Sequence, residues 1–275
     1  MQSFQILIPV YNDWNSLLIL LDKINKLEIN KICNLNVLIV DDASTENLNQ
    51  KITFLSFNSI EIIKNKKNIG HGKSIAYGIK YLTNKKNFDY LIVMDGDGED
   101  RPEEVKELIL KSLKTNKTVT ANRIKRSERI LFRFLYQCHI VLTYIITGRL
   151  IRFGNYMCMP NNQAKLLANN INTNVSFSGT VEKFIKNKDS IPSIRGLRYK
   201  QPTKMSLLKL IRHSLLIISI FKIEATFRIL AILFLINFII TKFAPQLFVF
   251  IFFPLFIISA MLILSLFYLY QKNIT

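Results

Sequence analysis

The chain has few of the residues that would stabilise a small secreted fold or hold a structural metal. It carries three cysteines in 275 residues, Cys33, Cys138 and Cys158. Their spacing is not that of metal ligands, and an odd number leaves no complete set of disulfides. We therefore expect reduced thiols in a cytosolic domain. The N-terminus also lacks a basic segment followed by an apolar one, so the sequence predicts no secretory signal peptide.

Acidic residues are scarce as well, since 19 Asp and Glu stand against 37 Lys and Arg, and the formal net charge is +18. Such an excess raises the question of nucleic-acid binding. We exclude nucleic acid as a partner because the basic residues gather beside apolar C-terminal segments and no recognised nucleic-acid motif is present. The few acids are not spread evenly, because six of them fall within YLIVMDGDGEDRPEEV, residues 90–105. Of these, Glu103 and Glu104 would only begin a helix, whose first turn favours acids.

Charge is absent from one long apolar run, Leu247 to Tyr270. At about 1.5 Å per residue this run is long enough to cross a hydrocarbon core of roughly 30 Å. Residues 225–241 predict a shorter first span, which a turn joins to the second. Basic residues before the first span and after the second place the N-terminal domain and the C-terminus in the cytoplasm. Residues 130–146 predict an amphipathic helix, either packed on the domain or dipping into the membrane interface.

The first two hundred residues alternate between strand and helix patterns. Strands are expected at residues 4–10, 36–42, 60–65 and 89–97, and helices at residues 14–27, 70–82 and 101–113. This alternation predicts an α/β fold with a mostly parallel sheet covered by helices on both faces. The chain would then divide into an α/β domain at 1–200, an interfacial amphipathic segment at 201–224 and a two-helix transmembrane hairpin at 225–275.

Acidic residues stand at the C-terminal ends of two of these expected strands, where ligands of such sheets bind. Asp41 and Asp42 end the second strand. Their alternative role is a turn before a helix that Ser44 or Thr45 would cap.

Asp95 and Asp97, separated by Gly96, end the fourth strand. Closely spaced carboxylates repel one another unless a cation relieves them. Mg²⁺ is held by oxygen ligands of this kind together with substrate phosphates. We therefore expect Asp95 and Asp97 to bind one hard divalent cation at this edge of the sheet; the resemblance described next implies Mg²⁺ or Mn²⁺.

Four ordered stretches, IPVYND, VLIVDDAST, NKKNIGHGKSIAYGI and YLIVMDGDGEDRPEEV, resemble the successive motifs of family 2 glycosyltransferases with the GT-A fold. The layout after them is similar to that of the polyprenyl-phosphate branch, the enzymes like dolichol-phosphate mannose synthase. The resemblance implies a membrane-anchored, inverting hexosyltransferase. It would move a sugar from a nucleotide-diphosphate donor to a lipid-linked acceptor, most simply polyprenyl phosphate, with Mg²⁺ or Mn²⁺. A homo-oligomer is compatible with it.

The resemblance also gives roles to individual residues. The nucleotide-sugar would contact Pro9, Tyr11, Asp41, Asp42, Asn68, Gly70, Lys73, Asp95, Gly96 and Asp97. His71 would not be catalytic but would lie within reach of the donor. Because guanidinium groups bind phosphate with two parallel hydrogen bonds, the acceptor phosphate would contact Arg123, Arg126, Arg195, Arg198 and Lys204. A basic surface facing anionic lipid is the alternative for Arg195 and Arg198.

Two departures from the family pattern leave the acceptor open. Asn155 stands where relatives often have an acid, and Gln201-Pro202-Thr203 replaces small residues. A phosphate acceptor is already ionised, whereas a sugar hydroxyl of a lipid-linked glycan would need a general base. Glu99, Asp100 and Glu182 are the candidates for that base, although a solvated helix position is the better reading of Glu182. The predicted catalytic group is Asp95, Asp97, Glu99 and Asp100. A catalytically silent membrane scaffold is a further alternative, against which the intact Asp95-Gly96-Asp97 argues.

Overall fold

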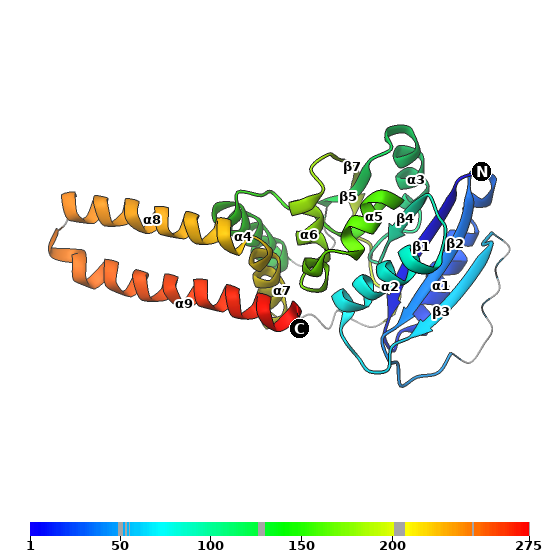
Figure 1. Cartoon of the computed structure of the whole chain (residues 1–275), viewed down its shortest axis with the longest axis horizontal. Coiled ribbons are helices and arrows are strands. Elements are labelled where there is room, and N and C mark those ends of the chain that lie inside the picture. Colours follow the sequence, from blue (N-terminus) through cyan, green and yellow to red (C-terminus); the bar gives the residue numbers. More distant parts are fainter. Residues whose placement is uncertain are drawn as a thin grey trace. The chain divides into compact units, whose positions relative to one another are not determined.

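The computed structural model describes residues 1–48, 52, 54, 56–125, 130–200, 207–243 and 245–274. The chain forms two compact units (Figure 1). The first unit comprises Met1–Arg129 and Arg152–Lys204, and the second comprises Ile130–Ile151 and Met205–Thr275. The helix expected at residues 130–146 thus belongs to the same unit as the apolar C-terminal helices.

The first unit is built on a sheet that has seven strands within the described residues, in the order β3-β2-β1-β4-β6-β5-β7. The strands are β1 (Ser3–Val10), β2 (Asn34–Asp41), β3 (Ser59–Lys64), β4 (Tyr90–Val93), β5 (Thr118–Lys125), β6 (Phe153–Pro160) and β7 (Lys188–Ile194). Strand β6 is antiparallel to both of its neighbours, and the other pairs are parallel. The predicted α/β fold with a mostly parallel sheet is confirmed.

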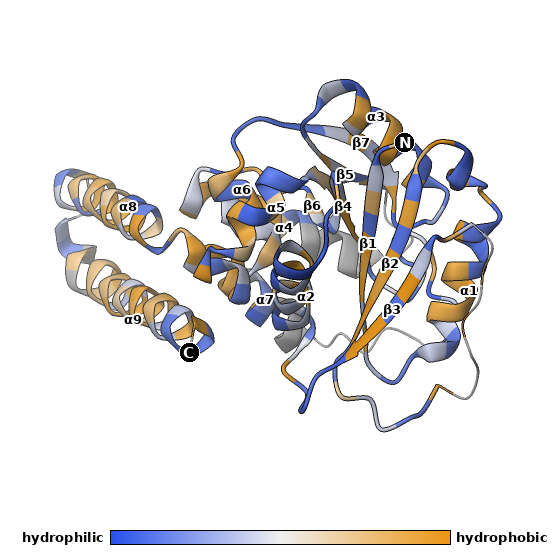
Figure 2. Ribbon diagram, turned by 45° about the vertical axis from the view of Figure 1, so that its right-hand side comes forward, coloured by the Kyte–Doolittle hydropathy of each residue, from blue (hydrophilic) through white to orange (hydrophobic). Residues whose placement is uncertain are grey.

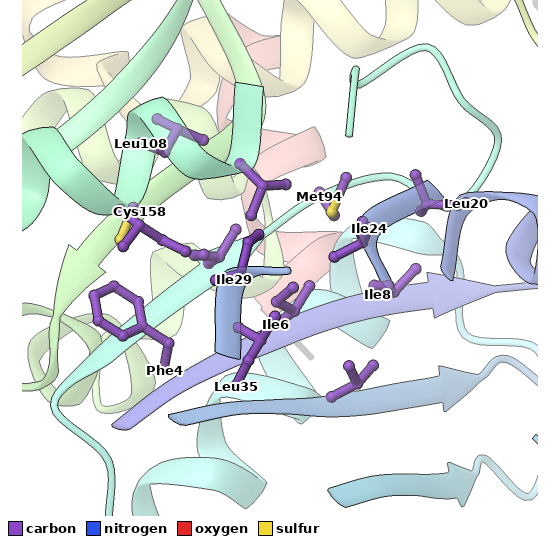
Figure 3. Packing of buried hydrophobic residues seen from close by; sticks show 14 of the residues in the cluster. Phe4, Ile6, Ile8, Leu20, Ile24, Ile29, Leu35, Met94, Leu108 and Cys158 are labelled. Carbon is purple, nitrogen blue, oxygen red and sulfur yellow. The ribbon is translucent and has the colours of Figure 1, made fainter. Parts of the chain in front are cut away.

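Helices cover both faces of this sheet (Figure 1). Two of them, α1 (Trp14–Asn25) and α3 (Glu104–Thr115), pack on one face. On the other face lie α2 (His71–Lys85), α5 (Asn161–Ala168) and α6 (Phe177–Phe184), while η1 (Ile29–Lys31) and η2 (Ile171–Asn174) are single 3₁₀ turns. Successive side chains of a strand point to opposite faces, so Ile6 and Ile8 enter the first core and Leu7 the second. Figure 3 shows the first core.

Two local expectations are wrong. Residues 42–48 form a loop rather than the start of a helix. Asp41 Oδ1 accepts a hydrogen bond from Ser44 N at 2.8 Å and closes a tight turn there. Glu104 does more than begin α3, because its buried carboxylate accepts hydrogen bonds from Ser193 Oγ at 2.7 Å and Ile194 N at 3.1 Å. It therefore fastens α3 to β7.

The second unit is helical in its described part, with α4 (Ile130–Thr147), α7 (Leu207–Ile220), α8 (Lys222–Phe243), η3 (Pro245–Leu247) and α9 (Phe248–Ile274). Its core takes residues from all four α-helices, including Ile146, Ile218, Leu233 and Leu266. The amphipathic helix predicted before the first span is α7, and it packs against α9 in this core.

Two of the described helices are long and apolar enough to cross a membrane (Figure 2). Lys222–Phe243 has a mean hydropathy of 2.1 and Phe250–Ile274 one of 2.6. Only 22% and 6% of their most apolar windows are buried, whereas the core helix of a soluble protein would be mostly buried. The two predicted apolar C-terminal helices are therefore present.

Candidate active site

The candidate site lies in the first unit, at the C-terminal ends of β1, β2 and β4. These three strands are parallel neighbours, so the residues that follow them meet at one edge of the sheet. A pocket of about 180 Å³ opens there, lined by Pro9, Val10, Tyr11, Asp42, Asn68, Gly70 and His71. Five of the predicted nucleotide-binding residues line this pocket. Asp41 and Lys73 do not belong to its described lining.

Asp42 shapes one wall of the pocket. Its Oδ1 accepts hydrogen bonds from Ile69 N at 2.8 Å and Asn65 Nδ2 at 2.9 Å, and its Oδ2 accepts one from Gly70 N at 2.8 Å. Gly70 has a φ of 90°, a conformation that glycine adopts without the steric cost of a side chain. Asp42 thus holds the loop that leads into α2 and presents His71, the first residue of that helix.

Asn12 joins the segment after β1, which carries the pocket residue Tyr11, to residues 44–46, a role that sequence reasoning missed. Its Oδ1 accepts hydrogen bonds from Thr45 N at 2.9 Å and Glu46 N at 3.2 Å, and its backbone N–H donates to Ser44 Oγ at 3.0 Å. The φ of Asn12 is 49°, in the left-handed region that asparagine tolerates better than most residues. An asparagine directly after a buried strand was the available signal.

Each aspartate of the Asp95-Gly96-Asp97 triplet lies beside a side chain able to carry positive charge. His71 Nε2 is 3.1 Å from Asp95 Oδ1. Arg198 Nη2 is 3.1 Å from Asp97 Oδ2 and 3.7 Å from Asp13 Oδ2. The sequence predicted the triplet but not these partners, which come from α2 and from the segment after β7.

That segment, residues 195–199, lies along the acidic loop. Arg195 forms an ion pair with Glu99, in which both side chains are 12% exposed. Gly196 N donates to Glu99 O at 2.8 Å, and Tyr199 N donates to Asp97 O at 3.0 Å. Arg195 and Arg198, two of the arginines predicted to bind an acceptor phosphate, therefore contact carboxylates of the chain itself.

Strands β5 and β6 add further groups to this edge. Asp100 is buried, and its Oδ2 accepts a hydrogen bond from Asp95 N at 2.9 Å. Arg123 Nη2 lies 3.8 Å from Asp100 Oδ1. Asn155 Nδ2 lies 2.9 Å from His71 Nε2. The asparagine that replaces a frequent acid thus contacts a histidine that itself contacts the triplet.

Burial and the charges of neighbouring residues give the three aspartates Asp95, Asp97 and Asp100 different pKa values. Burial, together with the charge of Asp95, raises the pKa of Asp97 to about 6 and that of Asp100 to about 8. For Asp95 burial acts in the same direction, but His71 and Arg123 outweigh it and hold the pKa of Asp95 well below its usual range. Desolvation acts to lower the pKa of His71, but the three carboxylates raise it overall. Asp95 is therefore the acid that keeps its charge most firmly.

The triplet fits a divalent cation, although not as a complete protein cage. Asp95 Oδ1 is buried, and within the described part of the chain its close contact with His71 Nε2 at 3.1 Å lacks hydrogen-bond geometry, so this oxygen has a lone pair that suits a hard cation. The described residues contain no group of three or more His, Cys, Asp or Glu side chains arranged to hold a metal. Asp95 and Asp97 would thus supply only part of a coordination shell, and phosphate oxygens and water would supply the rest.

Comparison with known proteins assigns this arrangement to a family. The family model described as "Glycosyl transferase family 2" matches residues 5–188, which include most of β1, all of β2 to β6 and the whole acidic loop. The chain belongs to glycosyl transferase family 2. The family part of the predicted resemblance is therefore confirmed.

Solved structures of similar fold support the GT-A prediction. Staphylococcus aureus TarS 1–349 is similar with a TM-score of 0.54 at 10% identity, over 96% of this chain and 80% of that one. The glucosyl-3-phosphoglycerate synthase of Mycobacterium tuberculosis, in complex with Mn²⁺, UDP-glucose and phosphoglyceric acid, has a TM-score of 0.52 at 12% identity. That similarity covers 82% of this chain and 80% of the synthase. The GT-A fold of this family 2 member is thus confirmed.

One curated relative matches at the level of sequence. It is an uncharacterized protein of Methanocaldococcus jannaschii, 27% identical over 113 residues. The match covers 40% of this chain and spans about half, 47%, of the relative's length.

Two of the residues predicted to contact the acceptor phosphate, Arg126 and Lys204, lie outside the described residues. Glu182 is not the solvated helix residue that we expected, because its side chain is 13% exposed and lies 3.2 Å from Lys188 Nζ. It is engaged in that ion pair, which fastens α6 to the start of β7.

Proposed function

We propose that this family 2 glycosyltransferase moves a sugar, with inversion, from a nucleotide-diphosphate donor to a lipid-linked acceptor, most simply a polyprenyl phosphate. The observation that carries the proposal is the position of the Asp42 pocket and the Asp95-Gly96-Asp97 triplet at one sheet edge, with His71 contributing to both. The first would take the nucleoside and the second the diphosphate.

The size of the pocket supports this division. At about 180 Å³ it is smaller than the roughly 300 Å³ from which sites for whole small molecules begin. It would therefore hold the nucleoside end, between Tyr11 and Asn68, and leave the diphosphate to lie beside His71 and Asp95. Asp95 and Asp97 would hold Mg²⁺ or Mn²⁺, whose charge would stabilise the leaving diphosphate. The Mn²⁺ and UDP-glucose in the mycobacterial synthase of similar fold are in keeping with this assignment.

The surroundings of the acids favour a phosphate over a hydroxyl acceptor. A hydroxyl would need a base that it can approach. The carboxylate of Glu99 is engaged in an ion pair with Arg195. Asp100 is 4% exposed, so an acceptor hydroxyl cannot approach the carboxylate of Asp100. An ionised phosphate needs no base. Arg123, whose guanidinium lies 3.8 Å from Asp100 and thus beyond hydrogen-bond distance, is the described arginine that we assign to it first.

The apolar helices support a lipid-borne acceptor. We propose that residues 1–200 are cytoplasmic, that 201–224 lie at the membrane surface and that 225–275 form a transmembrane hairpin. The uncharged length of α9 and the low burial of both candidate spans support the hairpin. An enzyme anchored in this way meets a polyprenyl acceptor in the membrane in which that acceptor dissolves.

A donor screen tests the proposal. Full-length protein in detergent is incubated with Mn²⁺ and UDP-, GDP- or dTDP-sugars, with and without polyprenyl phosphate, and release of nucleoside diphosphate is followed. We expect release with one donor that requires the lipid phosphate. In Asp97→Asn it should fall by about 100-fold or more, as when an electrostatic contact to a transition state is removed.

Other results would point elsewhere. Release that requires a lipid-linked glycan and ignores polyprenyl phosphate would support the hydroxyl acceptor. An absence of nucleotide binding with every donor would support the silent scaffold.

A further inference from the structure

Arg198 lies between two carboxylates that have different surroundings. Its Nη2 is 3.1 Å from Asp97 Oδ2, in the metal-binding triplet, and 3.7 Å from Asp13 Oδ2, directly before α1. The side chains of Arg198, Asp97 and Asp13 are 25%, 18% and 20% exposed. The guanidinium is thus partly buried between its two partners, and its Nε is buried without a hydrogen-bond partner among the described residues.

Arg198 pairs with the oxygen of Asp97 that is more open to a cation. Asp97 Oδ1 accepts a hydrogen bond from Glu99 N at 3.0 Å, which engages one of its two lone pairs and holds the loop. Asp97 Oδ2 faces Arg198 at 3.1 Å. A guanidinium cannot give up its charge at any ordinary pH, so it cannot share this oxygen with a divalent ion without strong repulsion.

The backbone keeps Arg198 at this place. Tyr199 N donates to Asp97 O at 3.0 Å and Gly196 N donates to Glu99 O at 2.8 Å. Arg195 adds its ion pair with Glu99. These contacts stand on either side of Arg198 in the chain, so the side chain can move between its two carboxylates while the segment stays attached.

We propose that Arg198 is a positioning residue that competes with the divalent cation for Asp97 and transfers to Asp13 when the metal binds. This inference rests on the metal role given to Asp97 in the proposed function. Asp13 lowers the free-energy cost of the exchange. Its carboxylate is not part of the triplet and can pair with the guanidinium that the metal displaces. In the metal-free site Asp97 is thereby paired with a positive charge, and the metal enters without leaving the guanidinium unpaired.

Mn²⁺ binding to the full-length protein in detergent tests the exchange, with no nucleotide present. Bound Mn²⁺ is counted by electron paramagnetic resonance of the free ion. We expect Arg198→Gln to bind Mn²⁺ about 10-fold more tightly, allowing for the partial exposure of the pair. The matched control is Arg101→Gln, which removes the same charge from a residue that pairs with Glu103, 3.5 Å away. It should change the affinity less than about 2-fold.

Asp13→Asn distinguishes exchange from a general change of charge. If Asp13 receives Arg198, this substitution weakens Mn²⁺ binding in the wild-type background and has little effect in the Arg198→Gln background. If the two residues act only through the overall field, their effects add. If Arg198→Gln does not fold, the same comparison of backgrounds is made with Arg198→Met, which also removes the charge and keeps much of the apolar stem of the side chain.

Three outcomes would overturn the inference. The first is that Arg198→Gln binds Mn²⁺ no more tightly than Arg101→Gln. The second is that Asp13→Asn has the same effect in both backgrounds. The third is that wild-type protein binds Mn²⁺ no better than Asp97→Asn, which would refute the metal role in the proposed function itself and is therefore recognisable as a separate failure.

Discussion

Glu99 separates the two acceptor hypotheses, and its replacement by glutamine gives the sharpest test. If the acceptor is a hydroxyl, Glu99 is a candidate base, and Glu99→Gln should abolish transfer while leaving the fold intact. In the structure Glu99 is instead the partner of Arg195, with both side chains 12% exposed. We therefore predict that Glu99→Gln acts mainly on stability.

The size of the effect follows from the burial of the pair. Removing one partner of a fully buried ion pair costs about 3–5 kcal/mol, because the remaining charge is left uncompensated. Some water reaches this pair and the amide of the variant keeps one hydrogen bond, so we expect about 2 kcal/mol. For a chain of this size that corresponds to a melting temperature lower by about 4–8 °C. The double variant Glu99→Gln, Arg195→Gln should be less destabilised than the two single variants added together, by about 1–2 kcal/mol.

The assay combines thermal melting in detergent with sugar transfer measured well below the melting temperature of each variant. Transfer by Glu99→Gln should stay within about threefold of wild type, a change of less than 1 kcal/mol in the barrier. The reasoning is refuted if the melting temperature is unchanged and transfer falls by about 100-fold or more. That pair of results would make Glu99 the base and favour the hydroxyl acceptor.

Two further predictions concern the frame of the site. Gly78→Ala should lower the melting temperature, because the new methyl would lie 2.4 Å from Leu7 Cδ1 and 2.9 Å from Val40 Cγ2; overpacking costs about 1–3 kcal/mol against a gain in helix propensity of about 1 kcal/mol. An increase in melting temperature would contradict this close approach of α2 to the sheet. Glu104→Gln should gain stability relative to wild type as pH rises above the unfolded pKa of Glu, about 4.3. Burial raises the pKa of Glu104 despite its bond from Ser193, so the contribution of Glu104 to stability is greatest below the unfolded pKa and is lost as pH rises through the folded one, a loss that the amide avoids. A stability difference that does not vary with pH would contradict this.

The sequence by itself determined the frame of the first unit and the place of its acids. FQILIPV is apolar except at Gln5 because β1 is covered on both faces, and WNSLLILLDKIN has helical spacing because α1 is covered on one. The apolar run of β4 ends directly before Asp95, so the position of the triplet at a strand end could be predicted. The uncharged length of α9 was visible in the same way. All of these are local sequence patterns, and each one depends only on which faces of a single helix or strand are exposed to water.

The partners of the acids could not be predicted, because the sheet order brings them together. Strand β7 pairs with β5 as the last strand in the order of the sheet. Because the chain leaves β7 at this position, Arg195 contacts Glu99, which lies 96 residues earlier in the chain. The antiparallel insertion of β6 likewise brings Asn155 to His71. A sequence pattern records how buried a residue is but not which distant residue it meets. The fold therefore decided that Arg195 and Arg198, which we expected to bind phosphate, contact carboxylates, because opposite charges brought together in a partly buried place are stabilised by pairing with each other.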